Sequence, residues 1–198
     1  MGIIRQARLQ DARAIGRIEV DTWRTTYAGM LPDRVLLRMS EERQTASWAG
    51  FLRHRPGDVF VALQHDRPRP RAGAPPSPEP RVLGFGNCGP QRETGFGYGG
   101  EIYTLYVAPE AQGLGLGRQL LLTLFARLMH CGHRSALVWV VRANPSRFFY
   151  ERLGGKLVLS RMVPVGGEPI EACGYGWSDL RALLDRQARS GAGGTSPS

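Results

Sequence analysis

The sequence predicts an α+β fold in which helices flank a mixed β-sheet. Apolar residues follow helical spacing in the first quarter of the chain and short β-rich runs after it, and strands and helices alternate further on. The 198 residues, 42% of them hydrophobic, suffice for one globular domain with a sizeable core. We therefore expect a single domain over residues 1–189, with a mobile insert at 66–81 and a disordered tail at 190–198.

The N-terminal part is expected to contain one strand and three helices. A short strand is predicted over residues 3–7. Asp11 can cap a helix whose apolar positions recur at helical spacing and which ends near residues 27–29. Pro32 suits the first turn of a second helix, and Ser40 can cap a third.

After these helices the chain becomes β-rich. Two such runs are separated by residues 66–81, which are rich in Pro, Arg, Ala and Ser and cannot bury enough apolar surface to offset their ordering entropy. A last short helix, capped by Ser178, is expected to end at Leu184. The predicted strands span residues 59–63, 82–86, 102–107, 136–141 and 157–163, with helices at 118–131 and 145–153.

The charge of the chain does not favour a nucleic-acid partner. The formal net charge is +9, but the basic residues are scattered, and Lys156 is the only lysine among them. Clustering on one element is what an electrostatic footprint for nucleic acid requires. An arginine-rich solvated surface explains the composition.

The cysteines and the hydropathy favour a cytoplasmic protein. Cys88, Cys131 and Cys173 have no CxxC spacing, which fits a reducing compartment. No stretch approaches the ~20 apolar residues of a membrane span, so no membrane partner is expected. Residues 130–133, His-Cys-Gly-His, have the composition of a helix end, and no metal site is expected there.

A glycine-rich loop follows the strand at 102–107 and leads directly into a helix. Gly113, Gly115 and Gly117 allow the backbone to approach a phosphate group, and the helix dipole directs its positive end at the same place. This order is typical of an anion site. Dinucleotide-binding folds differ in glycine spacing and carry an acidic residue after a second strand, and a phosphate-loop NTPase is excluded because no Gly-Lys-Ser/Thr follows.

With this loop the sequence resembles the GNAT superfamily of N-acetyltransferases. Residues 112–117, Gln-Gly-Leu-Gly-Leu-Gly, match the signature Gln/Arg-x-x-Gly-x-Gly/Ala of that family. A second signature, an Asn followed by a short helix with a Tyr and then a Gly, is similar to the run from Asn144 through Tyr150 to Gly154. The resemblance covers most of residues 3–177. It implies a mostly antiparallel sheet flanked by helices, with a central V-shaped cofactor cleft.

The resemblance implies acetyl-CoA as co-substrate and no metal. Backbone amides of the glycine loop would hold the pyrophosphate, the strand before the loop would pair with the pantetheine arm, and Asn144 would contact the cofactor from the next strand end. The residues assigned to the cofactor in this way are Leu105, Tyr106, Val107, Gln112, Gly113, Leu114, Gly115, Leu116, Gly117, Arg118 and Asn144.

Two catalytic residues follow from the same resemblance. An alkylammonium with a pKa of about 10.4 is neutral in only about one molecule in 10³ at pH 7, so a group is needed to take its proton. Glu101 is the candidate base, with Glu93 and Tyr103 as alternatives, although Glu101 is equally compatible with a polar strand position. Tyr150 would lie near the thioester sulfur and stabilise the leaving thiolate by a hydrogen bond, and packing in the core is its alternative role.

The acceptor is the least defined part of the prediction. Trp23 and Tyr27 fall where GNAT folds build the acceptor wall, although a large aromatic such as Trp23 also suits the core. The expected function is transfer of the acetyl group to a primary amine by direct attack in a ternary complex. The amine would belong to a small molecule or a peptide N-terminus. A non-catalytic acyl-CoA-binding or sensor module is the alternative, and family analogy also allows a homodimer.

Overall fold

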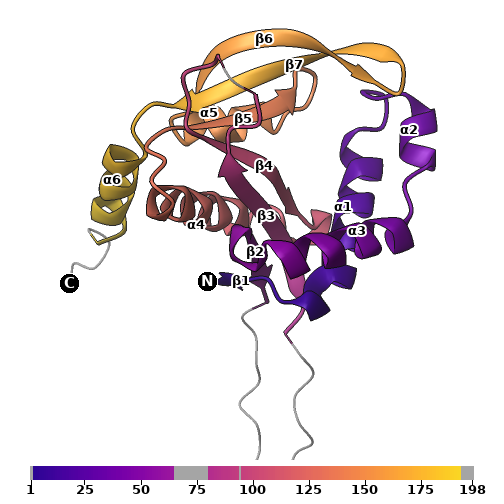
Figure 1. The fold of residues 1–198 in the computed structure, drawn as a ribbon, viewed down its shortest axis with the longest axis horizontal. Coiled ribbons are helices and arrows are strands. Elements are labelled where there is room, and N and C mark those ends of the chain that lie inside the picture. Colours follow the sequence, from indigo (N-terminus) through magenta and orange to yellow (C-terminus); the bar gives the residue numbers. More distant parts are fainter. Residues whose placement is uncertain (1, 65–79, 94, 193–198) are drawn as a thin grey trace, which may run out of the picture.

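The computed structural model describes residues 2–64, 80–93 and 95–192. Most of the predicted insert, residues 66–79, lies outside the described residues, as do residues 193–198 of the predicted tail. Seven strands form one sheet in the order β1-β2-β3-β4-β5-β7-β6 (Figure 1). Neighbouring strands are antiparallel except for the parallel pair β4 and β5. The predicted α+β class with a mixed, mostly antiparallel sheet is confirmed.

The elements follow the predicted order along the chain. The strands are β1 (Ile3–Gln6), β2 (Val59–Leu63), β3 (Val82–Pro90), β4 (Gly100–Val107), β5 (Ala136–Val141), β6 (Lys156–Val165) and β7 (Glu168–Trp177). The α-helices are α1 (Ala12–Thr26), α2 (Asp33–Leu37), α3 (Glu41–His54), α4 (Leu116–His130), α5 (Arg147–Arg152) and α6 (Leu180–Ala192). In the described part of the chain, no helix is long and apolar enough to cross a membrane.

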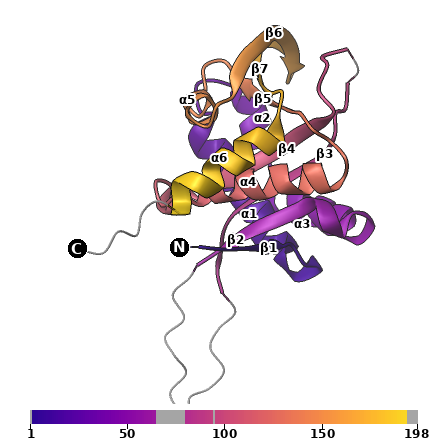
Figure 2. The same ribbon diagram turned by 90° about the vertical axis from the view of Figure 1, so that its left-hand side faces the viewer.

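Helices cover both faces of the sheet (Figures 1 and 2). Successive residues of a strand point to opposite faces, and two neighbours on β3 show what lies on each side. Phe85 contacts Trp48 of α3, with ring centroids 5.2 Å apart. A Cβ atom at Gly86 would lie 2.8 Å from the Leu124 side chain of α4. The pair α1–α3 therefore packs on one face, and α4 packs on the other.

The helix ends differ in part from the prediction. Asp11 precedes α1, but its carboxylate accepts hydrogen bonds from the Arg8 amide (2.6 Å) and from the Arg5 guanidinium, so the predicted capping bond to α1 is wrong. Ser40 accepts from the third amide of α3 (3.4 Å), which confirms its predicted role. At α6, Asp179 accepts from the Ala182 amide (2.9 Å), so the cap is Asp179 and not Ser178.

Two segments near the C-terminus were not anticipated. Helix α6 continues to Ala192, past the predicted end at Leu184 and into the predicted tail. Strand β7 has no counterpart with predicted bounds. It contains Gly174 and Gly176, which weaken a strand signal, and it is held by pairing with β5 on one edge and β6 on the other.

The sheet opens between its two central strands. β4 and β5 pair only over Gly100–Ile102 and Ala136–Val138, after which β4 stays with β3 and β5 stays with β7. A bulge opposite Asn87 and Cys88 leaves Tyr103 without a partner in the β3–β4 register, and bulges re-aim side chains in this way. The opening is the V-shaped cleft that was predicted.

Candidate active site

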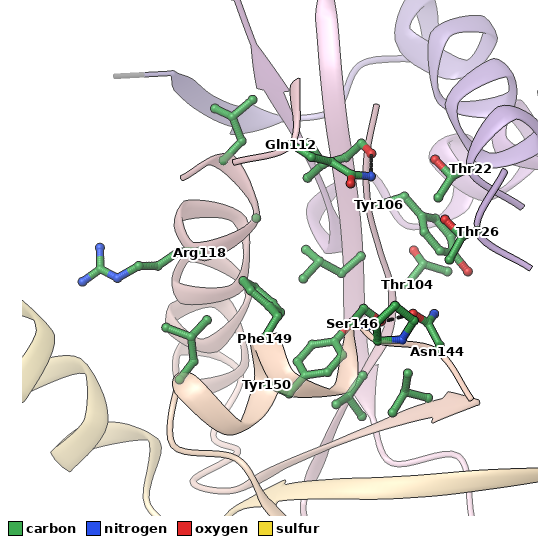
Figure 3. A pocket seen from close by; sticks show the side chains of 18 of the residues that line it. Thr22, Thr26, Thr104, Tyr106, Gln112, Arg118, Asn144, Ser146, Phe149 and Tyr150 are labelled. Carbon is green, nitrogen blue, oxygen red and sulfur yellow. Dashed lines mark hydrogen bonds between the residues drawn. The ribbon is translucent and has the colours of Figure 1, made fainter. Parts of the chain in front are cut away.

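A pocket of about 810 Å³ occupies the opening between β4 and β5. Its walls come from α1, β4, β5, α5 and the loop that leads into α4 (Figure 3). One end is formed by residues 112–117, here called the glycine loop. The other end is formed by hydroxyl-bearing side chains, here called the hydroxyl wall, which comprises Thr22, Thr26, Tyr27, Thr104 and Tyr106.

The glycine loop presents unpaired backbone amides at the start of α4. Gly113 and Gly115 have φ near +78°, a left-handed conformation that costs other residues roughly 1–2 kcal/mol. Among the described residues, the amides of residues 113–118 have no hydrogen-bond acceptor, and the first paired amide is that of Gln119 (3.1 Å to the Gly115 carbonyl). Open amides at the positive end of a helix dipole can bind an anion, so the geometry is compatible with the anion site that the sequence predicts.

Side chains around the loop have other partners. Gln112 donates its amide NH to the Pro109 carbonyl (3.3 Å) and its side-chain amide to the Val107 carbonyl (3.2 Å), which ties the loop to the end of β4. Leu114 is 66% exposed and does not line the pocket. The Arg118 guanidinium bonds Gln187 of α6 and points away from the other labelled side chains (Figure 3), while the backbone amide of Arg118 is open at the loop.

The middle of the pocket is bounded by β4 and by the segment before α5. Leu105, Tyr106 and Val107 line it where β4 has no strand partner on the β5 side, so the backbone edge there is open to an extended ligand. Asn144 is buried, and its side-chain oxygen accepts from the Ser146 amide (2.8 Å). Asn144 therefore fixes the turn that leads into α5, which carries Tyr150.

Tyr150 lies between the two ends of the pocket. Its ring is 6% exposed and packs against Phe149, Tyr175 and Trp177, with centroids 5.1, 6.4 and 6.2 Å away. The hydroxyl group makes no hydrogen bond within the described part of the chain. Burial raises the pKa of the phenol, and the nearby Tyr27 adds to the rise. The group therefore stays protonated near neutral pH and is free to donate a hydrogen bond.

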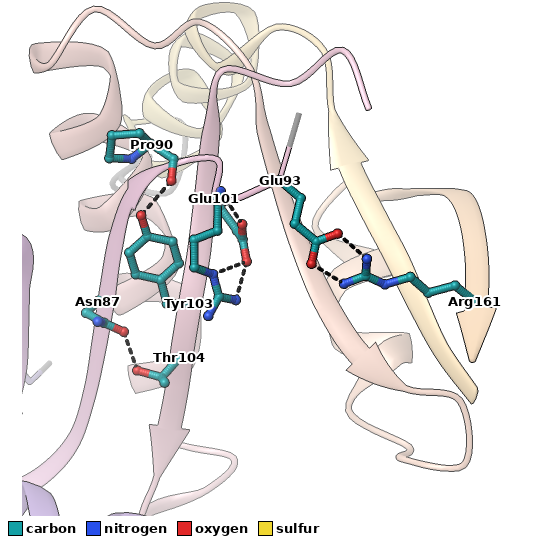
Figure 4. A network of polar contacts seen from close by, with 8 residues as sticks. Asn87, Pro90, Glu93, Glu101, Tyr103, Thr104 and Arg161 are labelled. Carbon is teal, nitrogen blue, oxygen red and sulfur yellow. Dashed lines mark hydrogen bonds and ion pairs between the residues drawn. The ribbon is translucent and has the colours of Figure 1, made fainter. Parts of the chain in front are cut away.

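Glu101 does not line the pocket, and its carboxylate belongs to a network of polar contacts (Figure 4). It is 2% exposed, and its carboxylate accepts hydrogen bonds from the backbone amide (3.0 Å) and Nε (2.9 Å) of Arg92, with a third contact from the terminal nitrogen of that guanidinium. Both oxygens are thus engaged by one residue. These contacts tie Glu101 of β4 to the β3–β4 connection.

The two alternative bases are also engaged. Glu93 pairs with both terminal nitrogens of Arg161. Tyr103 lines the pocket, but its hydroxyl donates to the Pro90 carbonyl (2.5 Å), and burial raises its pKa. Figure 4 shows these contacts side by side.

The hydroxyl wall is uncharged, and two of its hydroxyl groups form hydrogen bonds with residues that do not line the pocket. Trp23 does not line the pocket, but its indole NH donates to the Tyr106 hydroxyl (3.0 Å). Burial raises the pKa of Tyr106 well above its ordinary value, and burial also raises the pKa of Tyr27 against the opposing effect of the Asn144 and Tyr106 side chains. Thr104 donates to Asn87 (2.6 Å). Both phenols are therefore protonated at neutral pH.

Several lining residues were missed from the sequence. Thr22 and Thr26 of α1 lie one turn apart, and Thr104, Ser146 and Phe149 come from β4 and the α5 region. A signal existed only for Thr22, because it continues the buried helical spacing of Ile15 and Ile18 with a polar residue. Polar residues in a buried stripe call for a partner or a ligand.

Comparison with known proteins decides the family. The sequence matches the Acetyltransferase (GNAT) family over residues 21–155, more than half of the chain. The protein belongs to this family. It is also 33% identical, over 92% of its own length and 96% of the relative's, to the uncharacterized N-acetyltransferase YuaI of Bacillus subtilis (strain 168).

Solved structures show the same fold. The N-acetyltransferase from Staphylococcus aureus Mu50 has a TM-score of 0.66 at 19% identity, covering 91% of this chain and 99% of that one. The structure of yncA from Salmonella typhimurium, which contains its cofactor acetyl-CoA, has a TM-score of 0.63 at 21% identity, covering 91% and 94%. This GNAT protein is an acetyl-CoA-dependent N-acyltransferase, and the open amides of its glycine loop fit the phosphates of that co-substrate.

Proposed function

We propose that this GNAT protein transfers the acetyl group of acetyl-CoA directly to a primary amine while both substrates are bound. The observation that carries the proposal is the single continuous pocket. It joins the anion-binding glycine loop, the unbonded hydroxyl of Tyr150 and the hydroxyl wall (Figure 3). Two ligands that enter from opposite ends would meet beside Tyr150.

At the glycine-loop end of the pocket, backbone groups would bind acetyl-CoA. The amides of residues 113–118 would hold the pyrophosphate, and the open edge of β4 at Leu105 and Val107 would pair with the pantetheine arm as an added strand. Bound acetyl-CoA supplies an acyl thioester to be attacked. Binding along a fixed strand edge would direct the thioester toward Tyr150.

Tyr150 is proposed to stabilise the leaving thiolate. Its raised pKa keeps the hydroxyl protonated, so it can donate a hydrogen bond to the sulfur as negative charge develops. Full proton transfer from a phenol to a thiolate with an ordinary pKa of about 8.5 would be uphill. A hydrogen bond is therefore the role that the chemistry supports.

The acceptor amine is proposed to bind at the hydroxyl wall in its unprotonated form. No carboxylate lines the pocket in the described ranges, and Tyr27 and Tyr106 hold their protons too tightly to act as bases near pH 7. The amine would lose its first proton to solvent before binding, and after attack its second proton would go to solvent as the coenzyme A thiolate leaves. The placement of Glu101 favours this route over the predicted base role, which a pH profile can test.

A thiol-release assay over a panel of primary amines tests the proposal. Initial rates measured against both substrates should give intersecting double-reciprocal lines, as for a ternary complex, and the product should carry one acetyl group. Parallel lines would indicate a covalent acyl-enzyme and contradict direct attack. Binding of acetyl-CoA without thiol release for any amine would identify a sensor module instead.

A further inference from the structure

A buried hydroxyl group on α1 has no hydrogen-bond partner. Thr22 is 5% exposed and lines the pocket, and its Oγ1 meets no partner among the residues that the structure describes. A threonine inside a helix often donates to the carbonyl four residues earlier. Thr25 does so to Asp21 (2.8 Å), and Thr123 of α4 does so to Gln119 (2.9 Å). The hydroxyl of Thr22 is left for a group inside the pocket.

The same end of the pocket has no charged side chain. Within the described chain, the only charged residues that line the pocket are Arg118 of α4 and Arg152 of α5, and neither belongs to the elements that carry the hydroxyl wall. The nearest buried carboxylates are engaged elsewhere. Glu101 accepts from Arg92, and Glu19, one turn before Thr22, accepts from two side chains of α3 (2.7 and 2.9 Å).

This neutral surface discriminates between acceptors by charge. A carboxylate or a second ammonium next to the reacting amine would lose its hydration without gaining an opposite charge. An uncharged carbonyl loses less and needs only one donor. Thr22 can provide it, since its buried hydroxyl has no partner among the described residues, whereas the proton of Thr104 already goes to Asn87.

We propose that the hydroxyl of Thr22 binds an uncharged carbonyl adjacent to the acceptor amine. The acceptor class is then the aminoacyl amide, which is the chemistry of a peptide N-terminus, rather than a free amino acid or a diamine. This inference rests on the proposed acetyl transfer and specifies its second substrate.

Four small amines of similar size test the acceptor class. Glycinamide, glycine, ethylenediamine and propylamine are compared by thiol release at saturating acetyl-CoA and at equal concentrations of unprotonated amine. We expect the highest kcat/KM for glycinamide, at least about 10-fold above glycine and ethylenediamine because their second charge is unpaired. A higher kcat/KM for glycine or ethylenediamine would overturn the inference.

A pair of threonine variants tests the role of Thr22. Thr22→Val should lower kcat/KM for glycinamide by about 3- to 10-fold, the effect of one hydrogen bond, mainly through KM. Propylamine, which has no carbonyl, should lose clearly less activity than glycinamide, and Thr22→Ser should restore glycinamide. Thr123→Val is the matched control, because that hydroxyl bonds its own helix outside the pocket. An equal loss for glycinamide and propylamine would show that Thr22 only supports the fold.

A binding measurement separates failure of this inference from failure of the proposed function. Calorimetry with the coenzyme A complex needs no turnover, and it should show tighter binding of glycinamide than of glycine and a loss in Thr22→Val. If the wild type released no thiol with any of the four amines, the transfer itself would be contradicted. Glycine bound as tightly as glycinamide would contradict the acceptor class alone.

Discussion

The glycine loop and the hydroxyl wall lie at opposite ends of one pocket, and they are built in different ways. The loop is a contiguous run of six residues whose function depends on backbone amides and on the left-handed conformation of Gly113 and Gly115. The wall is assembled from side chains of α1, of Tyr27 directly after it and of β4, and α1 and β4 are about eighty positions apart in the sequence. A backbone site is encoded locally, whereas a side-chain site depends on how distant elements pack.

The difference also concerns tolerance to substitution. At the loop, any side chain that enters the anion site or any change of backbone conformation affects all amides together. At the wall, each hydroxyl contributes separately, and single replacements should have graded effects. The following predictions test that contrast from the largest expected effect to the smallest.

Gly115→Asp should weaken acetyl-CoA binding by more than about 10³-fold, because it removes several charge-assisted contacts and adds a negative charge beside the pyrophosphate. Calorimetric titration with acetyl-CoA measures the change. Gly132→Asp is the matched control, since Gly132 has a similar φ of +88° and open space around it at the far end of α4. If both variants bound the cofactor equally, the anion site would not be at the loop.

Tyr150→Phe should lower kcat by about 10²- to 10³-fold, the usual effect of losing one donor to a developing anion. Acetyl-CoA affinity should be nearly unchanged, because the ring packing stays. Since burial raises the pKa of Tyr150 above its ordinary 10.0, the wild type should show no alkaline loss from this group below pH 10. Tyr175→Phe, whose hydroxyl bonds Glu151 (2.7 Å) outside the pocket, should keep its kcat.

Glu101→Gln should lower kcat/KM by less than about 10-fold. The plot of kcat/KM against pH should have the same slope as that of the wild type. The melting temperature should fall by about 3 to 6 °C, because a charge-assisted contact with Arg92 is lost. Glu93→Gln, which alters the more exposed pair with Arg161, is the control for carboxylate loss in this region. A large loss at neutral pH that disappeared as pH rose would restore Glu101 as the base.

Glu19→Gln should produce a smaller effect, which is a change in how the stability of the protein depends on pH. Burial raises the pKa of Glu19 above its ordinary 4.5, partly offset by hydrogen bonds from Trp48 and Gln44. The native state then binds this proton more tightly than the unfolded chain, so the contribution present at low pH is lost as pH rises through the folded pKa. Melting curves from pH 4 to 8 should show that the stability of the variant increases relative to that of the wild type as pH rises.

Glu42→Gln should change the dependence of stability on pH in the opposite direction. The pKa of Glu42 is lowered, mainly by its hydrogen bond with Ser40, so its contribution is present above the ordinary value and is lost as pH falls. The stability of the variant should decrease relative to that of the wild type as pH rises. The change should be small because the carboxylate of Glu42 is exposed. The same trend in both variants would contradict the assignment of a buried carboxyl at Glu19.

Local patterns correctly predicted the order of the elements and most of their bounds, and the cofactor loop stays a prediction. Strand β5 was predicted residue for residue, because its apolar run is short and bounded by polar neighbours. The caps were less secure. Asp11 and Ser178 both have the right chemistry, but Asp11 bonds backward to the preceding turn and Asp179 replaces Ser178 at α6. A cap is chosen among adjacent candidates by geometry that composition does not record.

The sequence by itself determined the α+β fold and the GNAT resemblance, and it predicted an anion site at the glycine loop, since glycine conformation and helix position are local properties. Only the tertiary structure decided which side chains meet in the cleft. In the structure, Glu101 accepts a hydrogen bond from Arg92, and Trp23 donates one to Tyr106. The hydroxyl of Thr22 has no partner among the described residues. These outcomes depend on contacts between α1, the β3–β4 connection and β4, and a side chain's identity does not specify which distant group will satisfy its hydrogen bonds.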